Sequence, residues 1–225
     1  MKRLIVALDF PALDEAVSMA RPLVEEVGGF KVGLELISAE GPRAISAVAE
    51  LGSPVFADMK LHDIPNTVAG AARRIAAAGA RWVTVHASGG NEMMEAAVTG
   101  AGDTGVLAVT VLTSMSDIDV EEVGISSGLA TQVVNLATLA EAAGVEGLVC
   151  APGDVAAIRH KGLDLPIFTP AIRMTDSSDD QKRTGTPLEA VTAGADYLVV
   201  GRPVTRAPDP VGAAREITES IRQIR

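Results

Sequence analysis

FADMKLHDIPNTV, residues 56–68, has the pattern of a buried strand followed by the start of a helix. Because side chains alternate faces along a strand, we expect Asp58 and Lys60 on one side, about 7 Å apart, with Phe56 deeper in the core. Asp63 then lies in the turn beyond the strand. Buried charges are costly, so two carboxylates and an ammonium group this close together indicate a functional site.

The same order of elements recurs outward from this stretch: an amphipathic helical segment, a glycine and a short apolar run. The glycines in question are Gly28-Gly29, Gly52, Gly79, Gly144 and Gly194. Glycine supplies the left-handed residue after a helix, and continuous apolar runs are typical of strands buried on both faces. The pattern predicts strands near residues 3–8, 30–32, 55–60, 82–85, 106–111, 148–150, 166–168 and 197–200. Strands alternating with helices in a chain of 225 residues predict an α/β fold, a (β/α)8 TIM barrel forming one domain over residues 1–225.

An open, doubly wound sheet is the alternative α/β architecture. It more often carries a glycine-rich turn after the first strand, where this chain has DFPA at residues 9–12. The spacing of apolar residues predicts one helix over residues 12–27. Pro65 and Asp209-Pro210 are typical of the first turns of two other helices.

The composition limits the classes of function. A net charge of −10 with 3% aromatic residues argues against a nucleic-acid surface. No apolar run reaches transmembrane length, and the N-terminus lacks the pattern of a signal peptide, so we expect a soluble, cytoplasmic protein. The one cysteine, Cys150, stands among apolar residues and is expected to be a buried, unreactive thiol.

Polar residues follow several of the predicted strands. In a barrel of this type the active site lies at the carboxyl ends of the strands, so five ionisable groups are expected to converge there as a network of alternating charge: Asp9, Lys31, Asp58, Lys60 and Asp63. Three later predicted strands end in polar residues as well, at His86, at Thr113-Ser114 and at Gly201-Arg202.

A phosphate site is predicted at the last strand. The backbone amide near Gly201 and the guanidinium of Arg202 are suited to hold a phosphate group, as barrels of this type commonly do after strands seven and eight. The preceding loop, residues 169–185, is long, polar and rich in cations that could reach the same anion. Long loops in compact domains are often lids.

The run DMKLHDIPNT at residues 58–67 resembles the signature of the orotidine 5′-monophosphate decarboxylase family. Further matches follow in order along nearly the whole chain: ALD at 7–9, FKVG at 30–33, HA at 86–87, VTVLTS at 109–114, TP at 169–170, IR at 172–173, Gln181, and VGR at 200–202. The resemblance implies an enzyme that decarboxylates orotidine 5′-monophosphate to UMP and CO2, the final step of de novo UMP synthesis. It also implies a homodimer with shared active sites, and no cofactor or metal.

The resemblance further implies roles for individual residues. Lys31, Asp58, Lys60 and Asp63 are expected to form the catalytic charged network, with Lys60 as proton donor to C6. The implied substrate-binding residues are Asp9 and Lys31 at the ribose, Thr113 and Ser114 at the pyrimidine, Arg173, Gln181, Gly201 and Arg202 at the phosphate and lid, and Thr67, which enters the neighbouring subunit's site together with Asp63. The chain departs from the family at Ala171, where a Pro-Gly lid hinge is common. If this position needs a positive φ, the alanine is strained, and if it does not, the alanine stiffens the hinge.

Three rival functions remain. A Mg2+-dependent decarboxylase of a keto-sugar phosphate shares the Asp-x-Lys-x-x-Asp pattern, but Lys31 stands where that enzyme has metal-binding carboxylates. A zinc-dependent barrel epimerase would need a second histidine beside His86 at a strand end, and we expect none there. A non-catalytic phosphate-binding barrel is the third.

Overall fold

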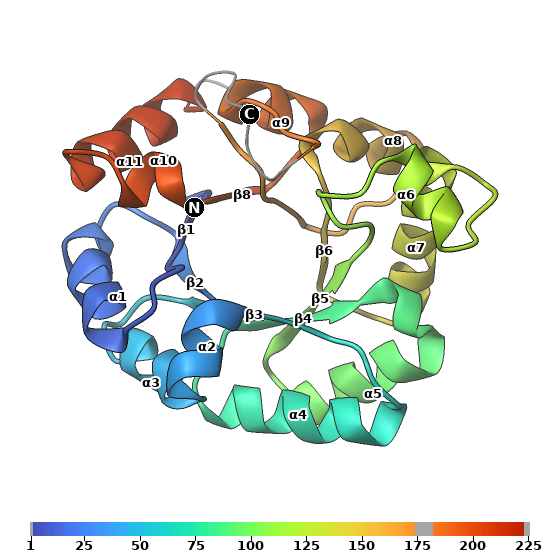
Figure 1. Ribbon diagram of the computed structural model, residues 1–225, viewed down its shortest axis with the longest axis horizontal. Coiled ribbons are helices and arrows are strands. Elements are labelled where there is room, and N and C mark those ends of the chain that lie inside the picture. The colour runs from blue at the N-terminus through green and yellow to red at the C-terminus, as the bar shows by residue number, and fades with distance from the viewer. Residues whose placement is uncertain (1, 174–181, 223–225) are drawn as a thin grey trace.

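The computed structural model describes residues 2–173 and 182–222 of the chain. Its strands are all parallel and close into a barrel, in which each strand pairs with the next and the last pairs with the first (Figure 1). The strands are β1 (Leu4–Ala7), β2 (Gly29–Gly33), β3 (Val55–Leu61), β4 (Trp82–His86), β5 (Gly105–Val109), β6 (Gly147–Val149), β7 (Ile167–Thr169) and β8 (Tyr197–Val200). The predicted (β/α)8 barrel is therefore confirmed.

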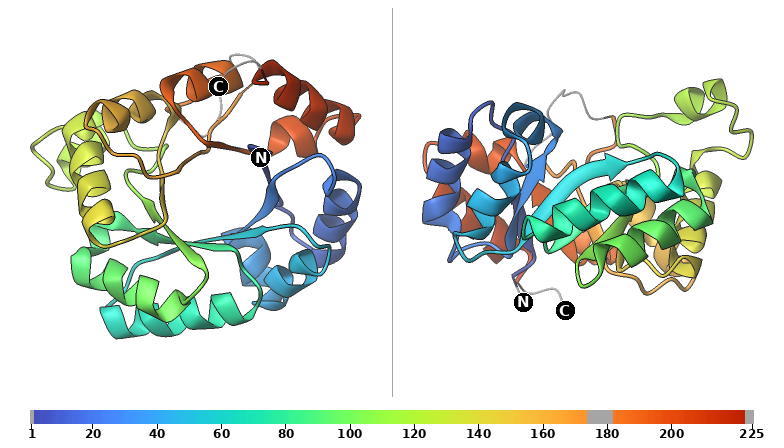
Figure 2. Two further views of the ribbon diagram at one scale, coloured as in Figure 1. Left: turned by 180° about the vertical axis from the view of Figure 1, so that it is seen from behind. Right: turned by 90° about the horizontal axis from the view of Figure 1, so that it is seen from below.

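Helices form a ring around the barrel, as both end-on views show (Figures 1 and 2). In the described part of the chain the α-helices are α1 (Leu13–Ala20), α2 (Leu34–Glu40), α3 (Arg43–Ala49), α4 (Pro65–Ala77), α5 (Asn91–Ala101), α6 (Asp117–Glu122), α7 (Leu129–Ala142), α8 (Val155–His160), α9 (Pro187–Ala193), α10 (Arg202–Thr205) and α11 (Pro210–Ser220). Short 3-10 turns are η1 (Arg21–Leu23), η2 (Ala87–Gly89) and η3 (Pro152–Asp154). None of the helices among the described residues has the length and apolar character needed to cross a membrane.

The strands are buried on both faces. One cluster of side chains fills the barrel, where the Phe56 and Phe168 rings meet edge to face at 5.7 Å. Alternate strand residues, such as Ala57, belong instead to the larger core between barrel and helices. This double burial explains why the strands appear in the sequence as continuous apolar runs.

Most helix boundaries follow the sequence signals. Pro65 begins α4, and the Asp209 carboxylate accepts a hydrogen bond from the Gly212 amide at the start of α11. Four of the predicted glycine caps have positive φ, namely Gly52, Gly79, Gly144 and Gly194. The prediction was wrong at Gly28, which has no positive φ and is small because a Cβ would collide with the Lys2 carbonyl oxygen.

Three elements are shorter than predicted, and the first is β1, which covers Leu4–Ala7 rather than residues 3–8. The helix predicted over residues 12–27 ends at Ala20 and passes into η1, which contains Pro22, because proline lacks the amide that a continuing α-helix needs. Strand β5 ends at Val109 rather than at residue 111. Both the amide and the hydroxyl of Thr110 donate to the Val149 carbonyl. The chain then turns, so Thr113 and Ser114 lie in a loop and not at a strand end.

Candidate active site

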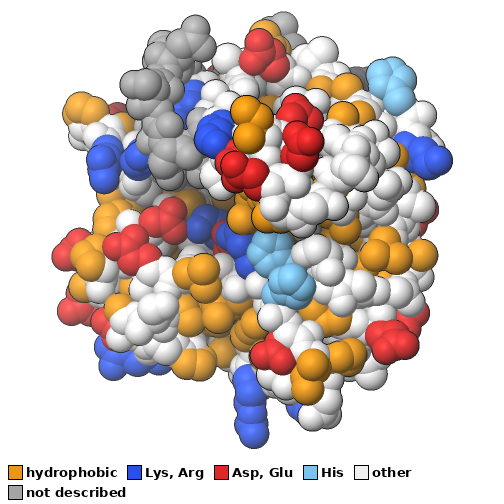
Figure 3. All heavy atoms as spheres, turned by 45° about the vertical axis from the view of Figure 1, so that its right-hand side comes forward, with side chains coloured by type: hydrophobic (Ala, Val, Ile, Leu, Met, Phe, Trp, Pro, Cys, Tyr) orange, Lys and Arg blue, Asp and Glu red, His pale blue; other side chains and the backbone are white. Residues whose placement is uncertain are grey.

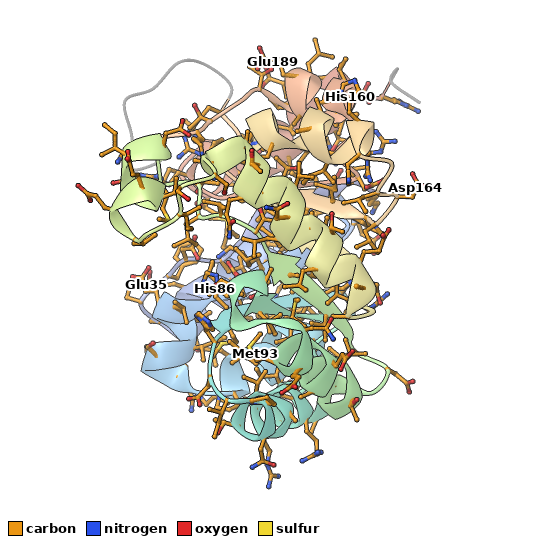
Figure 4. The ribbon with its side chains drawn as sticks, turned by 90° about the vertical axis from the view of Figure 1, so that its right-hand side faces the viewer. Glu35, His86, Met93, His160, Asp164 and Glu189 are labelled. Atoms are coloured by element: carbon orange, nitrogen blue, oxygen red, sulfur yellow. The ribbon has the colours of Figure 1, made fainter. Side chains whose placement is uncertain are left out.

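A cavity of about 310 Å3 opens at the carboxyl ends of the strands. Figure 4 shows the two ends of the barrel. Glu35, which follows β2, and His86, the last residue of β4, lie toward one side of the molecule. Asp164, which precedes β7, lies toward the other side. The cavity brings together most of the predicted site residues, namely Asp9, Lys31, Asp58, Lys60, Thr113, Ser114, Arg173, Gly201 and Arg202. In Figure 3 acidic, basic and histidine side chains meet near the centre of the face in view.

Four charged side chains form a row of alternating sign along the cavity wall. Lys31 Nζ lies 2.9 Å from Asp9 Oδ1 and 3.6 Å from Asp58 Oδ2. Lys60 Nζ donates to Asp58 Oδ1 at 2.8 Å. Asp58 thus lies between two ammonium groups, as predicted from strand alternation and from the convergence of β1, β2 and β3.

The charges in this row stabilise one another in their ionised forms. Burial alone would raise the pKa of Asp58, but Lys31 and Lys60 outweigh that cost and hold the pKa below its ordinary value. Burial alone would likewise lower the pKa of Lys31, but the charges of Asp58 and Asp9 raise it overall. At neutral pH Asp58 and Lys31 are therefore both charged.

Strand β3 is irregular where it carries these groups. Its pairing with β4 shifts between Ala57 and Leu61, which lie opposite Val83 and Val85. The bulge leaves Lys60 with φ of 48°, a left-handed conformation that a residue with a Cβ rarely adopts. The hydroxyl of Thr84 contacts both ends of the bulge, since it accepts from the Lys60 amide at 2.8 Å and donates to Asp58 Oδ1 at 3.1 Å.

Gly33 leaves room for the ion pair beside it. A Cβ at this position would lie 2.7 Å from Lys31 Nζ and 2.9 Å from Asp9 Oδ1. Its backbone angles suit any residue, with φ of −100°. The FKVG motif therefore needs glycine because of space and not because of backbone conformation.

Asp63 does not join the row within its own chain, although five converging groups were predicted. It is exposed, and its carboxylate accepts from the neighbouring Ile64 amide at 2.6 Å. Thr67, in the first turn of α4, is exposed as well. Neither residue lines the cavity.

The prediction that His86 lacks a second histidine partner was wrong. His62 follows β3 directly, and its ring centre lies 5.5 Å from that of His86. Burial, with His62 and Lys60 nearby, lowers the pKa of His86 and outweighs the effect of Asp58. Within residues 2–173 and 182–222, however, no three His, Cys, Asp or Glu side chains are grouped so that they could hold a metal ion.

Gly201 and Arg202 stand at the cavity rim, where α10 begins. Arg173 lines the cavity after β7, and Gln181 lies outside the described residues. Two other cations of the predicted phosphate loop are engaged elsewhere. Lys182 pairs with Asp119 at 2.7 Å, and Arg183 pairs with Asp154 at 2.6 Å and donates to the Val111 and Leu112 carbonyls.

Ala171 has φ of 62°, so of the two expectations for this position the strained alanine is the one found. We expect Ala171→Gly to raise the free energy of unfolding by about 0.5–1 kcal/mol, because glycine adopts this conformation without steric cost. Denaturation in urea measures the change. The matched control is Ala151→Gly, at a fully buried alanine with φ of −67°, where the same substitution should destabilise. If both variants lose the same free energy of unfolding, Ala171 is not strained.

Thr84 is the member of the site that the sequence reasoning missed. The signal was available, because alternation along β4 places a threonine on the lumen side, between Trp82 in the barrel core and His86 at the rim. A single hydroxyl in an apolar strand has an ordinary structural explanation. The bulge that gives it a partner in β3 is not readable from the sequence.

The chain is similar to known proteins over nearly its whole length. The family model described as "Orotidine 5'-phosphate decarboxylase / HUMPS family" matches residues 2–217. The orotidine 5′-phosphate decarboxylase of Anaeromyxobacter sp. (strain K) is 52% identical over 223 residues, which cover 98% of this chain and 98% of that protein. The enzyme of the same name from Novosphingobium aromaticivorans is 46% identical, with 96% of this chain and 97% of that protein covered.

Solved structures show the same similarity. The crystal structure of orotidine 5′-phosphate decarboxylase from Lactobacillus acidophilus superposes with a TM-score of 0.83 at 35% identity. The alignment covers 98% of this chain and 99% of that one. An uncharacterized conserved protein from Geobacillus kaustophilus has a TM-score of 0.85 at 38% identity, with 96% of this chain and 99% of that chain covered.

Proposed function

This chain belongs to the orotidine 5′-phosphate decarboxylase / HUMPS family, and we propose that it converts orotidine 5′-monophosphate to UMP and CO2 with Lys60 as the proton donor to C6. The observation that carries the proposal is the contact between Lys60 and Asp58 at the wall of a cavity whose rim holds Arg173 and Arg202. Such a cavity offers both cations for a phosphate and a lysine with a fixed partner.

The chemistry requires a cation at the reacting carbon. The bond between C6 and the carboxylate breaks, CO2 leaves, and the electron pair stays on C6 in the plane of the ring. The ammonium group of Lys60 stabilises this pair and then transfers a proton to C6; water returns a proton to the lysine. A preorganised charge is the largest source of stabilisation in such a step, because it is already in place when the new charge develops.

Asp58 has two roles in this proposal. It holds Lys60 in position at 2.8 Å, and it faces the carboxylate of the substrate. Repulsion between the two carboxylates is relieved as CO2 leaves. Because Asp58 remains ionised between Lys31 and Lys60, this repulsion persists across neutral pH.

The remaining residues bind the rest of the nucleotide. Asp9 and Lys31, which are joined at 2.9 Å, bind the ribose hydroxyls in this proposal. Thr113 and Ser114 line the cavity beside Leu112, which suits the pyrimidine ring. Arg202, Arg173, the amide of Gly201 and Gln181 are assigned to the phosphate, whose binding energy holds the reacting ring in place.

We propose a homodimer in which Asp63 and Thr67 complete the neighbour's site. Both are exposed next to Ile64, a large apolar side chain that is 66% exposed. An apolar residue flanked by two polar residues without a role in their own cavity suits a subunit interface. The cytoplasmic location expected from the sequence stays a prediction.

The Mg2+-dependent rival fits the cavity less well. It needs carboxylates free to bind a cation, and here the ammonium group of Lys31 already lies between Asp9 and Asp58, at 2.9 and 3.6 Å. A bound metal ion would have to displace this lysine against strong repulsion.

One assay tests the function. Purified protein is mixed with orotidine 5′-monophosphate and excess chelator, and the ultraviolet change on conversion to UMP is followed. We expect full activity with chelator present. Activity only after Mg2+ is restored would favour the metal-dependent rival, and no activity under either condition would favour a non-catalytic phosphate-binding barrel.

A further inference from the structure

Thr84 occupies an unusual place in the sheet. Three residues of the β3 bulge, residues 58–60, lie between the pairs that join Ala57 to Val83 and Leu61 to Val85, so they face this one residue of β4. The Thr84 side chain is completely buried. A buried hydroxyl must satisfy its hydrogen-bonding capacity with whatever faces it, and here that is the bulge.

In the two hydrogen bonds of Thr84, the chemistry of the partners determines which group donates and which accepts. The Lys60 amide can only donate, so the hydroxyl accepts from it at 2.8 Å. Its own proton is then available for the ionised carboxylate of Asp58, 3.1 Å away. Asp58 Oδ1 also accepts from Lys60 Nζ at 2.8 Å, which closes a ring of hydrogen bonds through the three residues.

The bulge needs such a support. At φ of 48° Lys60 is in a conformation that sterics disfavour, and strained residues persist only where their surroundings hold them. The hydroxyl of Thr84 binds the Lys60 backbone directly. The same hydroxyl orients the carboxylate that positions the Lys60 ammonium group.

We propose that Thr84 is a positioning residue for the decarboxylation: its hydroxyl holds the Lys60 backbone in the strained bulge and the Asp58 carboxylate against the Lys60 ammonium group. The role rests on the proposed function, since it acts through the two groups assigned to the chemistry. Thr84 itself does not line the cavity.

The test compares Thr84→Val, which keeps the shape but removes the hydroxyl, with Thr84→Ser, which keeps the hydroxyl. We expect Thr84→Val to lower kcat by roughly 10- to 100-fold, because two hydrogen bonds to a charged or strained group are lost. Affinity for UMP, measured by calorimetry, should stay within about twofold of wild type, because the residues assigned to ribose and phosphate are unchanged. Thr84→Ser should recover most of kcat.

The matched control is Thr104→Val. Thr104 directly precedes β5, at the end of the barrel opposite the cavity, and its hydroxyl donates to the Ala80 carbonyl at 2.9 Å. Removal of this hydroxyl should leave kcat unchanged. The stoichiometry of UMP binding, measured by calorimetry, gives the number of folded sites in each variant. The kcat of each variant is then expressed per UMP-binding site.

Three results would overturn the proposal: unchanged kcat in Thr84→Val, failure of Thr84→Ser to recover activity, or a parallel loss of UMP affinity and kcat. An inactive wild-type protein would instead refute the proposed function. In that case the role of Thr84 is still tested, without any activity measurement, by a crystal structure of Thr84→Val. Lys60 retaining its positive φ and its contact with Asp58 would overturn it, and loss of either would support it.

Discussion

Replacing Lys60 by alanine is expected to abolish turnover of orotidine 5′-monophosphate and to leave binding of UMP measurable. The substitution removes both the cation that stabilises the electron pair on C6 and the proton that C6 receives. Each of these contributions is worth about 10²- to 10⁴-fold, so we expect kcat to fall by roughly 10⁵-fold. UMP has no carboxylate at C6 and receives no proton from Lys60, so its binding does not require this ammonium group. Single-turnover kinetics and calorimetry measure the two quantities separately.

The control for this variant is Lys161→Ala, at an exposed lysine that follows α8, remote from the cavity. It should behave as wild type in both measurements. In Lys60→Ala the Asp58 carboxylate keeps Lys31 at 3.6 Å and the Thr84 hydroxyl, so the fold is expected to persist. Turnover within tenfold of wild type would remove Lys60 from its assigned role.

Much of the barrel and its charged row could be predicted because both follow from local rules. Continuous apolar runs after glycine give parallel buried strands, and the polar residue at each strand end then lies at a common rim. Asp58 and Lys60 share a face because strand side chains alternate. The contact distances of this row agree with that reasoning.

The parts that could not be predicted depend on how neighbouring strands pair. The bulge of β3 arises from its register with β4, and it alone explains why Thr84 contacts both Lys60 and Asp58. The early end of β5 likewise depends on the hydrogen bonds that Thr110 makes to β6. Neither register is encoded in the spacing of residues within one strand.

Positive charge alone did not predict which cations of the loop at residues 169–185 reach the cavity. Lys182 and Arg183 have the same charge as Arg173, yet they are paired with Asp119 and Asp154, which come from distant parts of the chain. The pairing of Arg183 is partly buried, and the same guanidinium donates to the carbonyls of Val111 and Leu112. Which cation is engaged in this way depends on tertiary contacts.

The second large effect concerns the division of the stretch 56–68 between two sites. Asp58 and Lys60 line their own cavity, whereas Asp63, three residues beyond Lys60, is exposed and does not line it. If Asp63 serves the partner, Asp63→Ala and Lys60→Ala chains should both be nearly inactive alone. When the chains are mixed, unfolded and refolded together, each hybrid dimer contains one site with Lys60 from one chain and Asp63 from the other.

When the two chains are mixed in equal amounts and pair at random, about half of the dimers are hybrids. One of the two sites in each hybrid is intact. Activity should therefore recover to about one quarter of the wild-type value. A mixture of Lys60→Ala with Asp58→Ala is the matched control. Both of those residues serve their own chain's cavity, so no hybrid site is intact and no activity should return. Recovery in the control mixture, or none in the Asp63 mixture, would show that Asp63 does not complete the neighbouring site. Recovery in the Asp63 mixture alone would make dimerisation part of the catalytic mechanism, because the exposed turn after β3 then has its function only in the partner's cavity.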